Sequence, residues 1–315
     1  MGILEIHKLN KSFGKQKVIK DLNLNVPEGS IFGFVGQNGS GKTTTMKIIL
    51  GLLKADSGVI TVCGERVIYG GTRTNRNIGF LPDVPEFYSY MKPKEYLNLC
   101  GEIAKSNKQK SNKQKSNKQK SNKQAEELLA LVGLTGEDKR IGGFSRGMKQ
   151  RLGIAQALIS RPRLLICDEP TSALDPIGRK EILDILRKIS DTTTVLFSTH
   201  ILPDVERICD NVAVLHDGNV AISGTLSEIR RLHKKDSLLL EFASREELQR
   251  FKSGLSVSKL IAGAEEKETE IVFHSENLQE IQRIIFSTLE ATKVYPLKLE
   301  VLEPTLENLF MEAVQ

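Results

Sequence analysis

The chain has 315 residues, of which 39% are apolar, and a formal net charge of +6. Its length is enough for two domains, and its apolar content is typical of a globular protein. No apolar run approaches the ~18 residues that cross a bilayer, and the first residues lack the charged-then-apolar order of a signal peptide. We therefore expect a cytoplasmic chain that another protein must bring to any membrane.

The positive charge is concentrated in one segment. Residues 105–124 repeat the unit SNKQK and contain eight Lys and no acid. Without them acidic residues slightly outnumber basic ones, so no specific nucleic-acid binding is expected. A five-residue period fits neither a helix face nor a strand face and buries nothing apolar, which predicts a largely disordered insertion between two helices. The alternative interpretation is a Lys-rich contact with an acidic partner or with lipid headgroups.

Cysteine spacing indicates neither a zinc site nor a redox motif. The four cysteines are far apart in the sequence and form no C-x-x-C pair, at Cys63, Cys100, Cys167 and Cys209. We expect buried free thiols in a reducing compartment.

Strands and helices alternate along the first 224 residues, which predicts an α/β fold with a mostly parallel sheet. Apolar runs and alternation predict strands at residues 3–6, 22–26, 30–35, 59–63, 78–81, 164–167 and 194–197. Helical spacing predicts helices at residues 43–53, 94–103, 125–132, 146–160 and around 182–189.

The pattern changes after Gly224, and residues 225–315 are predicted to form a small α+β domain. Strands are expected at residues 238–242, 255–261, 270–273 and 294–301, where Pro296 indicates an edge strand. Ser244 with Glu247 and Ser275 are expected to cap two helices, and residues 305–313 to form a third. The resulting order β-α-β-β-α-β is typical of a ferredoxin-like unit.

A glycine-rich loop joins the strand at residues 30–35 to the following helix. Residues 36–43 read GQNGSGKT, the pattern G-x-x-x-x-G-K-[ST] of a phosphate-binding loop. Glycines let backbone N–H groups turn toward phosphate oxygens, and the helix N-terminus adds partial positive charge. The loop predicts ATP and Mg²⁺ binding, with Lys42 on the β- and γ-phosphates and Thr43 on the metal, and the nucleotide-binding residues Gly36, Gln37, Asn38, Gly39, Ser40, Gly41, Lys42, Thr43 and Thr44.

Two adjacent carboxylates follow the apolar strand at residues 164–167. Such a pair is weak evidence alone, but after a phosphate loop it indicates the second half of a nucleotide site. We expect Asp168 to hold Mg²⁺ and Glu169 to polarise the attacking water. The phosphate loop alone would equally permit a kinase, a GTPase or a motor.

The segment between these two motifs carries a family resemblance. Residues 144–148 read FSRGM, in which Ser145 and Gly147 match the Ser and second Gly of the LSGGQ signature, whereas Phe144, Arg146 and Met148 depart from it. The chain thus resembles the nucleotide-binding subunits of ABC transporters, over about residues 3–224. Variants of this kind, and the C-terminal LEPTLENLF, are similar to the ABC-2-type exporter branch.

The resemblance assigns further residues. His200 looks like the switch histidine that contacts the γ-phosphate, Ser172–Asp175 like the D-loop, and Phe13 occupies the position of an adenine-stacking aromatic residue. Asp83 stands where the family usually has a Gln that senses Mg²⁺, so a metal role for Asp83 is expected only through a metal-bound water.

The fold implied by the resemblance is of the P-loop NTPase type, with an antiparallel β subdomain and a helical subdomain at about 84–160. The implied function is an ATPase that drives separate transmembrane permease subunits of an exporter, with a second copy closing over ATP, at the inner face of the cell membrane.

Two alternatives remain open: a soluble ABC-type ATPase acting on ribosomes or nucleic acid, and a regulatory module that hardly hydrolyses ATP. The single set of motifs opposes the first alternative, and the presence of both Glu169 and His200 opposes the second.

Overall fold

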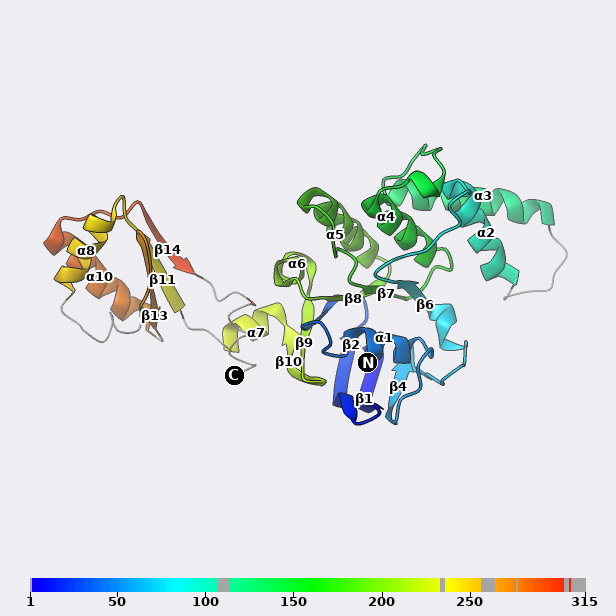
Figure 1. The fold of residues 1–315 in the computed structure, drawn as a ribbon, viewed down its shortest axis with the longest axis horizontal. Coiled ribbons are helices and arrows are strands. Elements are labelled where there is room, and N and C mark those ends of the chain that lie inside the picture. The colour runs from blue at the N-terminus through cyan, green and yellow to red at the C-terminus, as the bar shows by residue number, and fades with distance from the viewer. Residues whose placement is uncertain are drawn as a thin grey trace. The chain divides into compact units, whose positions relative to one another are not determined.

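Strands and helices do alternate along the chain, and they form two units in this computed structural model (Figure 1). The structure describes residues 2–106, 114–232, 236–255, 264–275, 277–302 and 306. One unit comprises Met1–Leu226 and the other Ser227–Gln315. Each unit is described below by itself.

A six-stranded sheet with the order β10-β9-β3-β8-β7-β6 forms the centre of the first unit. Neighbouring strands from β9 to β6 are parallel, and β10 runs antiparallel to β9 at one edge. The strands β3, β7 and β8 are buried along their whole length, as expected for apolar runs covered on both faces. The bounds are β3 Ile31–Val35, β6 Ile78–Leu81, β7 Leu164–Asp168, β8 Thr194–Thr199, β9 Asn211–His216 and β10 Asn219–Thr225.

A second, antiparallel sheet of the same unit has the order β2-β1-β4-β5. Its strands are β1 Gly2–Phe13, β2 Gln16–Pro27, β4 Ser57–Val62 and β5 Glu65–Arg66. Alternate residues of β1 and β2 are buried, and they share one hydrophobic core with β3 and the following helix α1 (Lys42–Ile49). Both sheets and the C-terminal unit agree with the predicted fold class.

The helices of the first unit begin and end where local chemistry favours it. Helix α5 starts behind Asp175, whose side chain accepts a hydrogen bond from the Gly178 N–H at 3.1 Å, and has Pro176 in its first turn. Its apolar side buries Ile182, Leu186 and their neighbours. The helix bounds are α2 Pro93–Ser106, α3 Gln114–Leu131, α4 Arg146–Ala157, α5 Pro176–Ser190 and α6 Leu202–Ile208, with 3₁₀ turns at η1 Thr74–Asn77 and η2 Ile141–Gly143. Helix α7 (Leu226–Leu232) begins at the last residue of the first unit and continues into the second.

The prediction that the SNKQK repeat is disordered is wrong for its second half, because α3 begins at Gln114 and includes the repeat up to Gln124. The last copy packs against its surroundings: Ser121 is buried, Asn98 donates to the Asn122 side chain at 2.7 Å, and Gln124 donates to the Ile159 carbonyl at 2.8 Å. Lys and Gln are good helix formers, so a helix started by the apolar residues after 124 extends back through them. Residues 107–113 lie outside the described residues.

The second unit has the predicted order β-α-β-β-α-β, with all its strand pairs antiparallel. Its sheet has the order β12-β13-β11-β14, which is the ferredoxin-like arrangement. It has a hydrophobic core of its own around Phe251, Phe273 and Ile285. The bounds are β11 Asp236–Glu241, α8 Arg245–Gly254, β12 Glu265–Lys267, β13 Glu270–Ser275, α10 Leu278–Thr292 and β14 Lys298–Leu302.

Two boundaries in this unit differ from the sequence prediction. Helix α10 is capped by Asn277, which accepts from the Glu280 N–H at 3.3 Å, and not by Ser275, which ends β13. Leu255 is the C-cap residue of α8 and does not start a strand, whereas residues 256–261 of the predicted strand lie outside the described residues. Strand β12 was not predicted. The edge position of β14 agrees with the signal from Pro296. The helix predicted at 305–313 lies outside the described residues, apart from Leu306.

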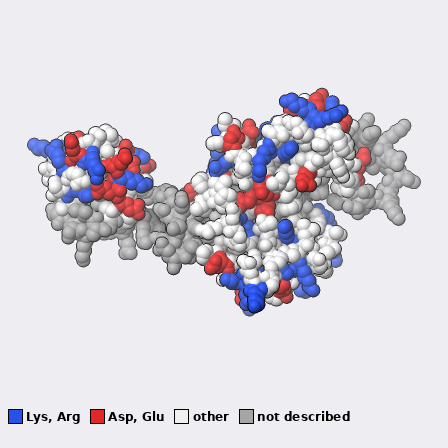
Figure 2. All heavy atoms as spheres, in the orientation of Figure 1, with Lys and Arg blue, Asp and Glu red and all other residues white. Residues whose placement is uncertain are grey.

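All four cysteines are free: Cys167 and Cys209 are buried, whereas Cys63 and Cys100 are half-buried. Lys, Arg, Asp and Glu side chains are interspersed on the visible face of each unit, and its described residues form no continuous basic track (Figure 2). Within the described part of the chain, no helix is both long and apolar enough to span a membrane.

Candidate nucleotide site

The four parallel strands β3, β6, β7 and β8 end at the same edge of the central sheet, and a predicted site residue follows each of them. Val35 lies beside Thr199, and Asp168 lies beside Ser198. Since parallel strands direct their carboxyl ends to one edge, the loops after them converge there. The sheet thus brings together motifs that are far apart in the sequence.

The phosphate loop has a conformation that only glycine permits at two positions. A Cβ at Gly36 would lie 2.5 Å from Ser40 Oγ and 2.7 Å from the Leu215 carbonyl oxygen, and Gly41 has a φ of 107°. Gly41 is followed directly by α1, whose N-terminus has neither a side-chain cap nor an acid in its first turn. The Ser40 hydroxyl is buried and makes no hydrogen bond within the described chain. These donors and the helix N-terminus suit an anion such as a phosphate group.

Lys42 connects the loop to the strand-end carboxylates. Its ammonium donates to the carbonyls of Gly36 at 2.7 Å and Gln37 at 3.2 Å, and lies 3.3 Å from Glu169 Oε1. The side chain is only 5% exposed. A buried ammonium needs compensating charge, and Glu169 supplies it. A polyphosphate entering the loop would offer the same ammonium a stronger anionic partner.

Glu169 lies between two further site residues. The backbone at Glu169 has a φ of 47°, a strained conformation for this residue that directs the chain sharply away from β7. Its Oε1 accepts no hydrogen bond from the described residues, and its Oε2 lies 3.0 Å from Nδ1 of His200. Lys42, Glu169 and His200 therefore form one continuous polar chain, as expected of groups that act on the same substrate.

Ser198 was not predicted from the sequence, yet it joins the two carboxylate residues. Its hydroxyl donates to Asp168 Oδ1 at 2.6 Å and accepts from the Glu169 backbone N–H at 3.0 Å. The signal that could have identified it is its register on β8 beside β7. Burial raises the pKa of the neighbouring Cys167 thiol, as does the charge of Asp168, so Cys167 adds no negative charge here.

A hollow of about 250 Å³, which we call the Lys42 hollow, opens between these groups. It contains the predicted metal-binding side chains Thr43, Asp83 and Asp168 together with Glu169. Their hydroxyl and carboxylate oxygens are the ligand atoms that Mg²⁺ prefers. No three His, Cys, Asp or Glu side chains of the described residues converge as a ready-made metal cluster. Mg²⁺ is usually held by one or two carboxylates plus substrate phosphates, so the arrangement fits this ion.

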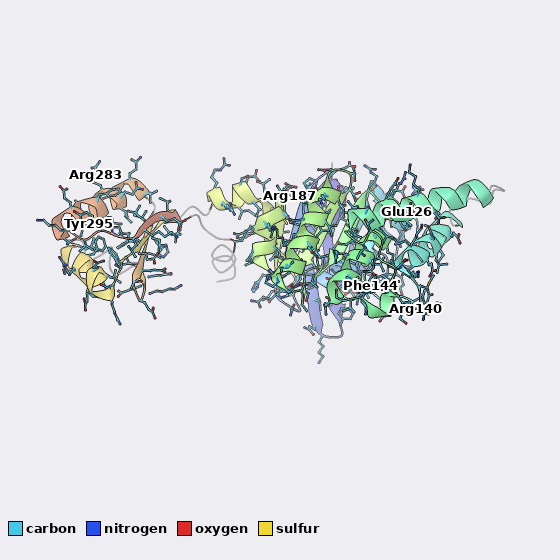
Figure 3. All side chains as sticks on the ribbon, turned by 90° about the horizontal axis from the view of Figure 1, so that it is seen from above. Glu126, Arg140, Phe144, Arg187, Arg283 and Tyr295 are labelled. Carbon is cyan, nitrogen blue, oxygen red and sulfur yellow. The ribbon has the colours of Figure 1, made fainter. Side chains whose placement is uncertain are left out.

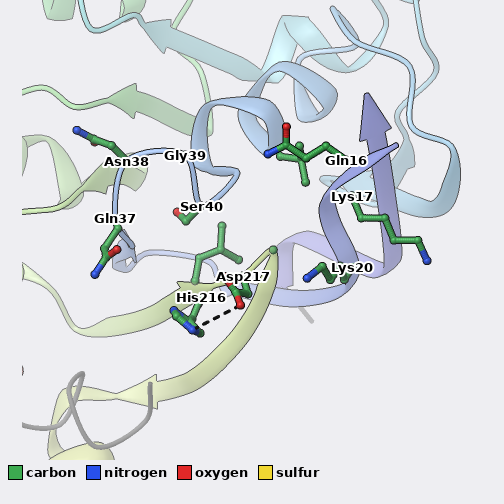
Figure 4. A pocket seen from close by; sticks show the side chains of 12 residues that line it. Gln16, Lys17, Lys20, Gln37, Asn38, Gly39, Ser40, His216 and Asp217 are labelled. Carbon is green, nitrogen blue, oxygen red and sulfur yellow. Dashed lines mark ion pairs between the residues drawn. The ribbon is translucent and has the colours of Figure 1, made fainter. Parts of the chain in front are cut away.

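A second hollow of about 360 Å³ lies on the other side of the loop tip (Figure 4). Asn38 and Gly39 line both hollows. Lys17 and Lys20 of β2 face it, as does the β9–β10 turn, where His216 Nε2 lies 3.8 Å from Asp217 Oδ2. The loop tip is therefore accessible from two sides.

Five predicted residues do not line either hollow: Phe13, Gly36, Ser145, Gly147 and His200. Phe13 is 50% exposed at the end of β1, with the Lys11 ammonium 5.3 Å from its ring centre. Ser145 caps α4 by accepting from the Met148 N–H at 3.2 Å, and Gly147 faces open space, since a Cβ there would meet only Leu174, at 3.9 Å. Within one chain, the signature segment is therefore separate from the phosphate loop.

Asp83, at the position where the resemblance expects Gln, lies in the Lys42 hollow but has a partner outside it. Its Oδ1 lies 3.2 Å from Nη2 of Arg146, which stands where the LSGGQ pattern has its first Gly. Phe144, which Figure 3 labels, stands where the LSGGQ pattern has Leu, and its side chain is buried.

Comparison with known proteins identifies the family. The model described as ABC transporter matches residues 19–172, and the model described as ATP-binding protein DrrA1-3-like, C-terminal domain, matches residues 224–314. The uncharacterized ABC transporter ATP-binding protein YxlF of Bacillus subtilis is 40% identical over 73% of this chain and 73% of its own length. The bacitracin transport ATP-binding protein BcrA of Bacillus licheniformis is 39% identical over 76% of this chain and 74% of its own. Among solved structures, the dimeric post-hydrolysis state of an ATP-binding cassette bound to ADP and Pi has a TM-score of 0.62 and 26% identity, covering 71% of this chain and 98% of that one.

Proposed function

The chain belongs to the ATP-binding proteins of ABC transporters, and we propose that two copies of it close over ATP to drive separate membrane-spanning subunits of an exporter. ATP binding and ATP hydrolysis coupled to transport are properties of this family, as are pairing of the cassettes and association with transmembrane subunits. The observation that carries the proposal for this site is the continuous polar chain of Lys42, Glu169 and His200 beside the phosphate loop.

We assign the phosphates to the loop from Gly36 to Thr44. The backbone N–H groups, the uncapped α1 N-terminus and the unbonded Ser40 hydroxyl provide donors, and Lys42 provides a positive charge for the β- and γ-phosphates. Adenine would stack on Phe13, whose exposed ring offers a π-face. Mg²⁺, held by Thr43 and Asp168 with Asp83 reached through a water, would neutralise phosphate charge as the terminal phosphoryl group leaves ADP.

Glu169 is assigned as the group that positions the attacking water and accepts its proton. Its backbone is strained and donates its N–H to Ser198, and its carboxylate is contacted by His200, which directly follows β8. When a water oxygen forms its bond to the γ-phosphorus, the bond from that phosphorus to the bridging oxygen of ADP breaks. His200 then holds Glu169 in place and faces the phosphate.

The signature segment is assigned to the second copy's ATP. Ser145 and Gly147 lie on a surface outside the Lys42 hollow, and the space beside Gly147 is open. Closing of two copies would place this segment over the phosphates of the partner's nucleotide, so that ATP stabilises the closed pair and hydrolysis releases it. One copy alone therefore supplies only part of each ATP site.

Replacing Glu169 by Gln tests this assignment. The amide keeps the shape but cannot accept a proton, so we expect steady-state phosphate release to fall by about 10²-fold or more while ATP binding persists. Size-exclusion chromatography with MgATP should then show a stable dimer that the wild-type chain forms only transiently.

The matched control is Glu181→Gln, which removes a charge from α5 where Glu181 pairs with Arg151, away from the hollow. It should retain wild-type turnover. Undiminished turnover in the Glu169 variant would refute the role of Glu169.

The partners and the location follow from the same proposal. The membrane-spanning subunits would be separate chains at the inner face of the cell membrane, and an exporter is favoured by the bacitracin transport relative and by the matched C-terminal unit. Affinity purification of the native complex in mild detergent should recover multi-span membrane proteins. Recovery of ribosomes or nucleic acid in their place would contradict it.

A further inference from the structure

Two unusual residues, one in each of two motifs, contact each other in the structure. Asp83 stands in the loop after β6 where this family usually has Gln, and Arg146 stands in the signature segment where the LSGGQ pattern has Gly. The Arg146 guanidinium and the Asp83 carboxylate form an ion pair with a distance of 3.2 Å between Nη2 and Oδ1. The two departures are therefore parts of one interaction between β6's loop and the start of α4.

Helix α4 holds this loop at two points of different character. Gln150 is fully buried and donates to the Asp83 backbone carbonyl at 2.6 Å, which fixes the path of the loop. Arg146 contacts only the Asp83 side chain, and the two side chains are 42% and 47% exposed. The backbone contact comes from a buried side chain, whereas the exposed ion pair is weak enough to exchange with another partner.

The charge of Arg146 is unfavourable at its position in the absence of Asp83. It is the first residue of α4, where the helix dipole disfavours a cation, and the first turn of α4 contains no acid. Asp83 supplies the missing negative charge from outside the helix. Conversely, Arg146 neutralises one of the three carboxylates that line the Lys42 hollow.

We propose that Arg146 is a positioning residue that competes with Mg²⁺ for the carboxylate of Asp83. This proposal rests on the function assigned above, in which the Lys42 hollow receives MgATP. Asp83 lies in that hollow with Thr43 and Asp168, so a hydrated Mg²⁺ there attracts the same carboxylate that Arg146 holds.

The exchange has a consequence for the signature segment. When Mg²⁺ engages Asp83, Arg146 loses its partner, and its guanidinium becomes available between Ser145 and Gly147. Mg²⁺ binding in the Lys42 hollow therefore leaves the positive charge of Arg146 unpaired in the signature segment. The hydrogen bond from Gln150 keeps the loop after β6 attached to α4. The ion pair thus links Mg²⁺ binding in the Lys42 hollow to the charge of the signature segment.

The test is a titration of free Mg²⁺ into the full-length chain at a fixed concentration of ATP, with nucleotide binding followed by calorimetry. Arg146→Met should lower the half-saturating Mg²⁺ concentration, because an exposed ion pair corresponds to about a two- to fivefold change in an equilibrium constant. Asp83→Asn should raise it. The double variant should match Asp83→Asn alone, since Arg146 has no carboxylate left to compete for.

Controls separate this role from general effects on α4. Arg146→Lys keeps a cation and should restore a value near that of the wild type. Arg151→Met removes another cation from the same helix, one that pairs with Glu181 at 3.5 Å outside the hollow, and should leave the Mg²⁺ dependence unchanged. Thermal melting of each variant establishes that it is folded.

Three outcomes would overturn the proposal: no shift in Arg146→Met, an equal shift in Arg151→Met, or a double variant that differs from Asp83→Asn. If the wild-type chain bound ATP with no Mg²⁺ dependence at all, the metal assignment would fall together with the ion-pair proposal. If Mg²⁺ dependence were normal and only the Arg146 shift absent, the assigned function would stand and the competition alone would be refuted.

Discussion

The register of β7 against β8 determines which residues of the site contact each other. Asp168 and Ser198 lie side by side on β7 and β8, which lets one hydroxyl serve both Asp168 and the backbone of Glu169. A buried carboxylate with a short hydrogen bond is held in one orientation, and a residue with strained backbone needs such support. Ser198 thus orients the two acidic residues without touching the nucleotide itself.

Ser198→Ala is expected to reduce ATP turnover by about tenfold or more, as loss of a supporting hydrogen bond typically does around a metal site. It should also destabilise the first unit by about 1–3 kcal/mol, because the buried Glu169 N–H loses its partner. Phosphate release and thermal unfolding measure the two effects. Ser190→Ala, which removes a hydroxyl at the end of α5 outside the hollow, serves as the control. Full turnover in the Ser198→Ala variant would show that Asp168 and Glu169 need no such support.

Several helices of this chain begin where the sequence supplies a capping residue. Ser145, Asp175 and Ser244 each cap the helix that follows them. The prediction failed at α10, where Ser275 was expected to cap the helix but Asn277 is the cap. The pairing of β11 with β13 extends to Ser275, which leaves Asn277 as the cap.

Asn277→Ala is therefore expected to lower the stability of the second unit by about 1 kcal/mol, whereas Ser275→Ala should leave the α10 cap intact. Chemical denaturation followed by circular dichroism can compare the two variants. A larger loss in the Ser275 variant would contradict the cap observed here.

At the scale of the whole molecule, the two units have separate cores. One core joins β1, β2, β4, α1 and β3, and the other joins β11, β13, α8 and α10. The site residues, from Phe13 to His200, all belong to the first unit. The described residues that line the Lys42 hollow all lie in the first unit.

A chain ending at Leu226 is expected to fold and to bind MgATP with an affinity within about threefold of the full chain, since no core residue of the first unit is removed. Circular dichroism and calorimetry provide the measurement. The full chain is the reference, and failure of the shortened chain to fold would show that its core depends on residues after 226.

The sequence by itself determined the features that depend on neighbouring residues. The phosphate loop, the strand that ends in Asp168 and Glu169, and most elements up to β8 could be predicted because their chemistry lies within a few consecutive positions. The elements α6, β9 and β10 were not predicted. The sequence also identified Asp83 and Arg146 as departures from the family pattern, but it did not show that these two residues contact each other. The helical second half of the repeat was missed, since its packing at Ser121 and Gln124 involves residues far along the chain.

Only the tertiary structure decided which distant residues meet. Strand register brought Ser198 to Asp168, and the packing of α4 beside β6 brought Arg146 to Asp83. Such contacts depend on how strands and helices pack, which no local pattern contains, because one shift in register would place different side chains in the same space. The sequence therefore determined the chemistry available at the site, and the fold decided which of its groups act together.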